Sequence, residues 1–179
     1  MTKIAVLVGS LSKDSINKKY AKALQQFAPE GVEFVDVSID LPLYNHDLDG
    51  DYPESAKLLK QQIEDADGVL LVTPEYNRSF SGSLKNAIDW ASRPWGTNSF
   101  NGKPLAITGA SIGPVGTSQA QQALRNVALF LNTKVMGQPE AYVDINRIFD
   151  QDGNVSEDSG QFLSDYIGAV ANHVESNKA

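Results

Sequence analysis

Two kinds of apolar pattern alternate along the chain and predict alternating strands and helices. Short runs that are continuously apolar, or that alternate apolar and polar residues, are typical of strands. Strands are expected at residues 3–8, 32–37, 68–73 and 103–108, with an interrupted fifth strand at Val135 and 141–143. Between these runs apolar residues recur at helical spacing, which predicts helices at residues 16–28, 53–65, 82–92, 117–131 and 157–174.

Strands that alternate with helices indicate a parallel, doubly wound α/β sheet of five strands, covered on both faces as a three-layer sandwich. A chain of 179 residues has the length of one domain, so a single domain over residues 1–179 is expected. In a doubly wound sheet of order 2-1-3-4-5, ligands bind beyond the carboxyl ends of strands one and three. The loops after strands one, three and four are therefore expected to meet and form a site.

Composition narrows the chemistry that the chain can perform. It has no Cys and only two histidines, His46 and His173, which are far apart in sequence and are expected at the surface. We therefore expect no metal site and no catalytic side chain, so that difficult chemistry would reside on a cofactor. A net charge of −7 disfavours a nucleic-acid partner, and no apolar run is long enough to cross a membrane. In the absence of an export signal, we expect a cytoplasmic protein.

Hydroxyl and amide side chains crowd the loop after the first strand. Ser10, Ser12, Ser15 and Asn17 follow Gly9, and the loop runs directly into a helix. Free N–H groups and the positive end of the dipole make a helix N-terminus an anion site. A helix cap would explain Ser15 alone but not the whole group, so the loop predicts phosphate binding. Its single glycine excludes a dinucleotide-binding fingerprint.

The other two loops suit a planar heterocycle. Residues 73–82 include Pro74, Tyr76 and Asn77, which offer flat apolar faces beside amide groups for stacking and in-plane hydrogen bonds. Surface aromatics that contact a second subunit would explain this loop equally well. Residues 109–116 are rich in glycine, which lets the backbone approach a ligand closely, although a plain glycine turn is the alternative.

With these three loops the chain resembles the NADPH-dependent FMN reductase family of flavodoxin-like proteins. The most specific likeness is TPEYN at residues 73–77 followed by GSLKNAIDW at residues 82–90. The resemblance implies a flavodoxin-like fold, bound FMN, and NADPH or NADH as co-substrate. It implies that electrons pass through FMN to a small acceptor, such as a quinone, free flavin, azo compound or metal oxyanion. The resemblance leaves the acceptor and the choice between NADH and NADPH open.

The resemblance also implies which residues bind FMN. The phosphate would be held by Ser10, Ser12, Ser15, Ile16 and Asn17, the isoalloxazine would be bordered by Pro74, Glu75, Tyr76 and Asn77, and its pyrimidine side by Ala110, Ser111 and Gly113. Two positions depart from the family, which usually has Arg where Ser12 stands and Pro where Ser81 stands; Lys13 or Lys18 could supply the missing charge. Family members are commonly dimers or tetramers, which implies a homo-oligomer with contacts through the helices at residues 82–92 and 117–131.

Two alternatives remain open from the residues alone. Residues 109–113 satisfy the G-x-S-x-G pattern of a serine hydrolase, with Ser111 as nucleophile and Asp144 or Asp150, then His173, in triad order. A flavodoxin-type electron carrier would bind FMN without reacting rapidly with NAD(P)H.

Overall fold

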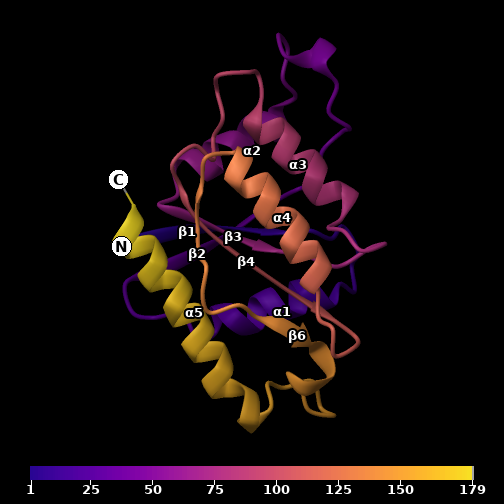
Figure 1. The fold of residues 1–179 in the computed structure, drawn as a ribbon, viewed down its shortest axis with the longest axis vertical. Helices are drawn as coiled ribbons and strands as arrows, with labels where there is room; N and C mark the ends of the chain where they lie inside the picture. The colour runs from indigo at the N-terminus through magenta and orange to yellow at the C-terminus, as the bar shows by residue number, and fades with distance from the viewer. Residues whose placement is uncertain (179) are drawn as a thin grey trace.

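The computed structural model describes residues 1–178, and its central element is a parallel sheet of six strands (Figure 1). The strands are β1 (Thr2–Val8), β2 (Val32–Val37), β3 (Gly68–Val72), β4 (Pro104–Ser111), β5 (Lys134–Val135) and β6 (Tyr142–Asp144). Their order is β2-β1-β3-β4-β5, with β6 also paired to β4. The predicted doubly wound order is thereby confirmed.

Two short strands share the outer edge of β4. β5 pairs with the start of β4 at Pro104–Leu105, and β6 pairs with its end at Gly109–Ser111. This is the interrupted fifth strand that the sequence predicts, and it accounts for the sixth strand of the sheet.

Helices cover both faces of the sheet, as a three-layer sandwich requires (Figure 1). Helices α1 (Ile16–Gln25) and α5 (Glu157–Asn177) bury side chains such as Tyr20 and Leu163 against one face. Helices α2 (Glu54–Glu64), α3 (Gly82–Ser92) and α4 (Ser118–Phe130) pack side chains such as Leu59, Leu84 and Leu124 against the other. The strands between them, β3 above all, are buried on both sides, which explains their continuous apolar sequence.

Two helix ends differ from the expectation. α1 ends at Gln25 instead of Ala28, because the N–H groups of Phe27 and Ala28 bond to carbonyls three residues back and the chain leaves the helix before Pro29. α5 continues three residues beyond Val174 to Asn177. Two short 3₁₀ helices, η1 (His46–Leu48) and η2 (Ile145–Arg147), lie in loops that periodicity does not reveal.

Trp90 fixes α3 in the core. Its side chain is fully buried, its ring meets those of Tyr44 and Tyr52 edge to face, and its Nε1–H donates to the Pro42 carbonyl at 2.8 Å. On the exposed side of the same helix Lys85 and Asp89, four residues apart, form an ion pair at 2.7 Å. The long loop before α2 is thus anchored to α3.

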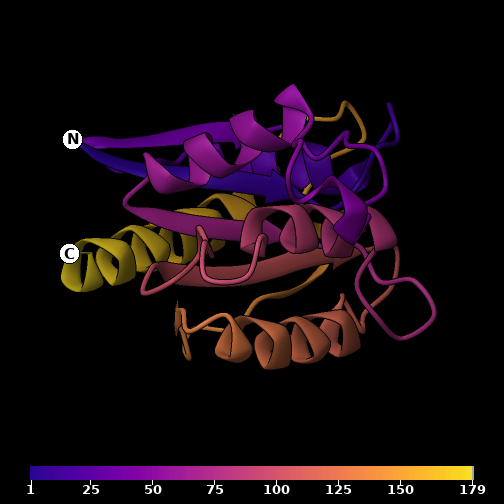
Figure 2. The ribbon, with the colours of Figure 1, turned by 90° about the horizontal axis from the view of Figure 1, so that it is seen from above.

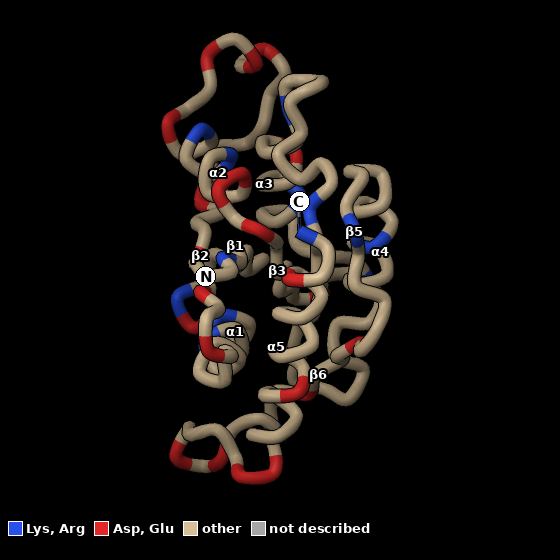
Figure 3. The backbone as a smooth tube through the Cα atoms, turned by 90° about the vertical axis from the view of Figure 1, so that its left-hand side faces the viewer, with Lys and Arg blue, Asp and Glu red and all other residues tan. Residues whose placement is uncertain are grey.

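Both ends of the described chain lie at the edge of the sheet where the strands begin (Figure 2). There Lys178 Nζ donates to Thr2 Oγ1 at 3.1 Å. Acidic residues gather in two loops at opposite ends of the molecule, around residues 47–51 and 150–158 (Figure 3). No helix within residues 1–178 combines the length and the apolar character that a membrane span needs.

Candidate functional site

The loops that follow β1, β3 and β4 meet at the carboxyl edge of the sheet. We call residues 9–17 the first loop, 73–82 the second loop and 109–116 the third loop, although β4 continues three residues beyond the predicted end at 108, so that residues 109–111 are its last residues and pair with β6. A Cβ at Gly9 would lie 2.9 Å from Ser81 Oγ and 3.1 Å from Pro74 Cδ, so the first loop touches the second. A Cβ at Gly109 would overlap the Thr73 carbonyl oxygen, so the third loop starts directly against the second. The structure therefore brings together the three loops that the sequence assigns to one site.

The first loop leads into α1 with its hydrogen-bond donors free for an anion. Ser15 is the N-cap residue of α1, and its Oγ accepts from Lys18 N at 3.3 Å. The N–H groups of Ile16 and Asn17 lie in the first turn, where no intrahelical acceptor exists. Ser10 is buried and its Oγ accepts from Ser12 N at 3.3 Å, which holds the loop closed on itself. This set of backbone donors and hydroxyls fits a phosphate.

Asn17 joins the first loop to the third. Its Nδ2 donates to the Ala110 carbonyl at 2.9 Å, and its Oδ1 accepts from Ala110 N at 2.8 Å. Two residues earlier along the same side of β4, Thr108 O accepts from Thr73 N. Where β3 turns away, the Asn17 carboxamide therefore takes over the hydrogen bonds of a neighbouring strand. Its side chain is thus committed, and only its backbone N–H is left to face a phosphate.

Lys18 lies over the first loop, near the position where the family usually has Arg. Its Nζ donates to the Ser12 carbonyl at 3.0 Å, whereas the Ser12 side chain is exposed. Of the two lysines named as substitutes for the missing Arg, Lys18 is the one that the structure ties to the loop.

A tight turn at the tip of the second loop presents Tyr76. Tyr76 and Ser79 exchange two backbone hydrogen bonds, of 2.8 and 3.0 Å, around Asn77 and Arg78. Both central residues have positive φ, 51° and 66°, a left-handed conformation that costs free energy for residues other than glycine and often occurs at functional sites. Tyr76 remains 56% exposed while Pro74 behind it is buried. The turn therefore holds an aromatic ring outward at the edge of the site.

Glu75 has a role that the sequence did not reveal. Its Oε2 accepts from the N–H groups of Gln119 and Ala120, at 3.0 and 3.2 Å, in the first turn of α4. Thr117, the N-cap residue of α4, makes no side-chain capping bond. Glu75 thus caps α4 from the second loop, and this carboxylate oxygen is occupied by the two N–H groups of the helix.

Replacing Glu75 by alanine should lower the free energy of unfolding by about 1–2 kcal/mol, because α4 loses its cap and a favourable charge at its N-terminus. Urea denaturation measures the effect. Glu30→Ala, at an exposed turn, is the control and should change stability by less than about 0.5 kcal/mol. Equal effects of the two substitutions would contradict the capping role.

The third loop is shaped by glycine and by Ser111. A Cβ at Gly116, where φ is +61°, would lie 2.6 Å from the backbone of Tyr142. Ser111 Oγ donates to the Gly113 carbonyl at 2.9 Å, and Asn146 Nδ2 donates to the Ile112 carbonyl at 3.1 Å. These bonds hold the loop against β6 and expose its apolar side chains.

Exposed apolar side chains come from all three loops. Their exposed fractions are 52% for Leu11, 56% for Tyr76, 78% for Ile112 and 56% for Val115. Large apolar side chains that gather at one edge around polar donors are typical of a ligand site. The arrangement suits a flat ring with a phosphate tail.

Ser81 begins α3 in place of the family's proline. It is the N-cap residue, with φ of −67°, and its Oγ accepts from Leu84 N at 3.2 Å. Proline would keep this φ but would remove the cap. Serine can therefore replace the family's proline at position 81 without a change in the backbone conformation.

The hydrolase alternative fails on geometry. Ser111 is at the carboxyl end of β4, whereas His173 Nε2 contacts the carbonyl of Lys134, which pairs with the opposite end of β4. A strand of eight residues spans about 23 Å, so no Ser–His contact forms. Asp144 accepts from Asn146 N and caps η2. Within residues 1–178 there is also no cluster of His, Asp and Glu that could hold a metal ion.

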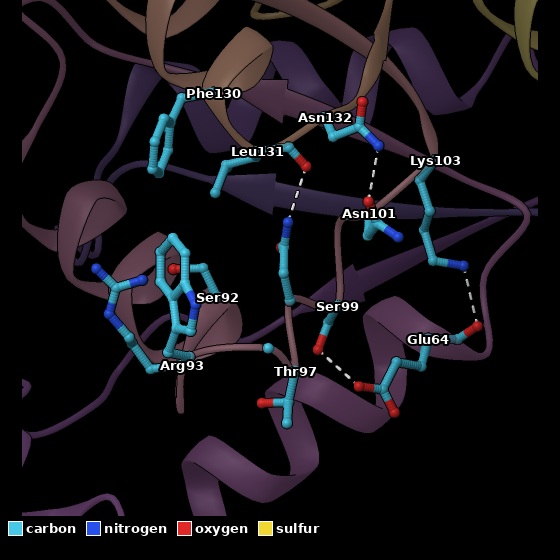
Figure 4. A pocket seen from close by; sticks show the side chains of 13 residues that line it. Glu64, Ser92, Arg93, Thr97, Ser99, Asn101, Lys103, Phe130, Leu131 and Asn132 are labelled. Carbon is cyan, nitrogen blue, oxygen red and sulfur yellow. Dashed lines mark hydrogen bonds between the residues drawn. The ribbon is translucent and has the colours of Figure 1, made fainter.

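A cavity of about 730 Å³ lies at the other edge of the sheet, among the C-terminal ends of α2, α3 and α4 (Figure 4). The polar groups in its wall bond to one another: Ser99 Oγ to Glu64 Oε1 at 2.6 Å, and Asn98 Nδ2 to the Leu131 carbonyl at 2.8 Å. These hydrogen bonds tie the segment before β4 to the helices. They support a structural role for this region.

The fold and the three loops together define a flavoprotein reductase of the flavodoxin-like class. Residues 2–146 match the family described as NADPH-dependent FMN reductase, and this chain belongs to that family. It is 53% identical over 174 residues to a 2-hydroxy-1,4-benzoquinone reductase of Burkholderia sp., with 94% of each chain covered. It is 42% identical over 179 residues to a quinone reductase of Pseudomonas putida, with 98% of this chain and 96% of the relative covered.

Among solved structures, FerB from Paracoccus denitrificans, described as a flavoenzyme NAD(P)H:(acceptor) oxidoreductase, superposes with a TM-score of 0.93. The two chains are 46% identical, and the match covers 100% of each. These comparisons confirm the predicted fold, the FMN cofactor and the NAD(P)H-dependent oxidoreductase class. They favour an enzyme over a simple electron carrier.

Proposed function

We propose that the protein transfers electrons from NAD(P)H through bound FMN to a quinone-type acceptor. The observation that carries the proposal is the convergence of the three loops, with phosphate donors on the first and an exposed apolar rim shared by all three. The names of two relatives, a 2-hydroxy-1,4-benzoquinone reductase and a quinone reductase, support a quinone as acceptor.

The FMN phosphate would be held at the start of α1. Ser10, Ser12 and Ser15 supply hydroxyls, and Ile16 and Asn17 supply backbone N–H groups. Lys18, on the same loop, adds a positive charge. The electrostatic attraction replaces that of the family's usual arginine.

The flavin ring would lie between the second and third loops. Pro74, Tyr76 and Asn77 with the backbone of Glu75 would border the isoalloxazine, while Ala110, Ser111 and Gly113 would face its pyrimidine side. Bound FMN would supply the redox chemistry, accepting hydride from NAD(P)H and reducing the acceptor. The rim side chains would exclude water and offer the apolar surface on which a quinone can stack.

Purified protein loaded with FMN tests the proposal. In the absence of oxygen, NADPH or NADH should bleach the flavin absorbance. Adding 1,4-benzoquinone should restore the absorbance at a rate at least as high as the steady-state turnover rate. Tyr76→Ala should raise KM for the quinone several-fold while FMN stays bound, whereas Tyr142→Ala, outside the three loops, should not. Failure of both nicotinamides to reduce the flavin would refute the electron-transfer function, and reduction without quinone turnover would refute the acceptor.

The proposal includes a homo-oligomer that contacts through α3 and α4. Leu129 and Phe130, at the end of α4, are 68% and 71% exposed, and Trp95, just after α3, is 78% exposed. Exposed apolar side chains that gather at neighbouring helix ends mark an interaction surface. A cytoplasmic location is part of the same proposal, because NAD(P)H is available there.

Phe130→Lys should convert the oligomer into smaller species, since a charge at the centre of an apolar contact is costly to bury. Lysine at a helix C-terminus is otherwise well tolerated, so the fold should persist. Sedimentation velocity measures the mass, and Phe162→Lys, on the opposite face in α5, is the control. Unchanged mass for Phe130→Lys, or a monomeric parent protein, would contradict this interface.

A further inference from the structure

A second cavity adjoins the first loop on the side away from the second and third loops. It measures about 590 Å³ and lies between α1 and the end of β2. Ser10, Leu11 and Ser15 line it, so it shares a wall with the proposed phosphate site. None of its lining residues belongs to the second or third loop, so it is distinct from the flavin-ring site.

One wall of this cavity is positively charged. Lys13, Lys18, Lys19 and Lys22 line it, four of the 15 basic residues in a chain whose net charge is −7. Among residues 1–178, none of the ion pairs involves these four lysines. Lysines that gather without carboxylate partners in an acidic protein attract an anion, and phosphate is the anion that such clusters commonly hold.

The opposite wall offers hydrogen-bond acceptors. Asp36, Ser38 and Asp40 follow one another at the end of β2, whereas Val37 and Ile39 between them are buried in the core on the other face of the sheet. Asp36 accepts from Gln25 Nε2 at 2.8 Å, which leaves the exposed Asp40 carboxylate as the acceptor for a ligand hydroxyl. A free carboxylate has two oxygens that can accept hydrogen bonds from the neighbouring hydroxyls of a ribose.

We propose that this cavity binds an adenosine 5′-phosphate group that belongs to a dinucleotide. The phosphate would lie against Lys19 and Lys22, the ribose hydroxyls would donate to Asp40, and the adenine would cover the apolar side chains of Leu11 and Val8. Because the cavity shares Ser10 and Ser15 with the FMN-phosphate site, the inference rests on the proposed position of that phosphate.

Two dinucleotides carry this group. In FAD the adenylate is attached directly to the flavin phosphate, so it would continue from the first loop into the cavity. In NAD(P)H it is attached to the nicotinamide nucleotide, and the lysines would also favour the 2′-phosphate of NADPH. The chemistry at the cavity is the same, and binding experiments separate the two sources.

Calorimetry on the FMN-loaded protein tests the cavity with two probes, 5′-AMP and adenosine 2′,5′-bisphosphate. We expect both to bind, and the double variant Lys19→Gln/Lys22→Gln should weaken binding by about tenfold or more, because charged hydrogen bonds to phosphate are lost. The control Lys57→Gln/Lys85→Gln makes the same charge change on α2 and α3 and should leave probe affinity within about twofold. Asp40→Asn should also weaken binding of 5′-AMP, whose ribose hydroxyls are both free to donate to the carboxylate.

The FMN affinity of the same variants separates this inference from the proposed function. If FMN binds normally and neither probe binds, or if the control weakens the probes as much, the cavity is not an adenylate site. If FMN itself does not bind, the proposed function fails, while the same probe measurement on the protein without FMN still decides the adenylate site.

Two further measurements on the Lys19→Gln/Lys22→Gln variant decide whether the adenylate in the cavity belongs to FAD or to NAD(P)H. Selective loss of FAD affinity in the apoprotein, with FMN affinity unchanged, would assign the site to FAD. A rise in KM for NADPH with kcat unchanged would assign it to the nicotinamide dinucleotide. If neither changes, the adenylate of a dinucleotide does not use the cavity and the inference is overturned.

Discussion

Replacement of Asn17 by leucine is expected to lower the free energy of unfolding by about 3 kcal/mol. Leucine has a similar volume but leaves the N–H and carbonyl of Ala110 without partners, and a buried unpaired group costs about 1–3 kcal/mol. Chemical denaturation measures the loss. Asn101→Leu removes an exposed amide that accepts from Asn132 Nδ2, and this control should cost less than about 0.5 kcal/mol.

In an Asn17→Asp variant the loss of stability is expected to depend on pH. The introduced carboxyl would be buried against the Ala110 carbonyl oxygen, which raises its pKa in the folded state above its unfolded value. Protonation restores a donor toward that oxygen. Stability relative to the parent protein should therefore increase as the pH falls from 7 towards 5 and decrease as the pH rises. A loss of stability that does not change with pH would contradict the hydrogen bonds between the side chain at position 17 and the backbone of Ala110.

Gly109→Ala is expected to have the largest effect on stability, a loss of about 4 kcal/mol or more, or failure to fold. A methyl group there would overlap the carbonyl oxygen of Thr73 and the hydroxyl of Thr117. The carbonyl belongs to the backbone and cannot move without separating β3 from β4. Soluble yield and denaturation of the purified variant measure the outcome.

Gly82→Ala is the matched control for Gly109. Nothing lies within 4 Å of the added methyl group at Gly82, the first residue of α3. The substitution should leave stability unchanged or raise it slightly, because alanine favours the helix. Similar behaviour of the two variants would show that the contact between the second and third loops does not constrain the fold.

The regular elements and the meeting of the three loops could be predicted from the sequence, for physical reasons. The apolar run of β3 and the helical spacing of Leu84 and Ile88 are local patterns that the fold preserves. The loops after β1, β3 and β4 meet because the strand order requires it. The prediction of a fifth strand in two pieces was correct because residues 137–140 interrupt its apolar pattern.

The partners of individual side chains could not be predicted in the same way. Asn17 resembles a phosphate ligand in the sequence, and only the contact between α1 and β4 shows that its carboxamide bridges to Ala110. The family resemblance implies that Glu75 borders the flavin, yet its carboxylate caps α4, 44 residues later in the sequence. Both roles depend on distances across the fold, which a local pattern does not contain.

The division of the fifth strand has a consequence for how copies of the chain can associate. β5 has two residues and β6 has three, so neither provides a row of free backbone groups long enough to template another strand. At the opposite margin β2 carries Glu33 and Asp36, whose like charges would repel a second β2. Edge-to-edge pairing of sheets is thus disfavoured at both margins, which leaves the side chains on the helical layers as the surface for association.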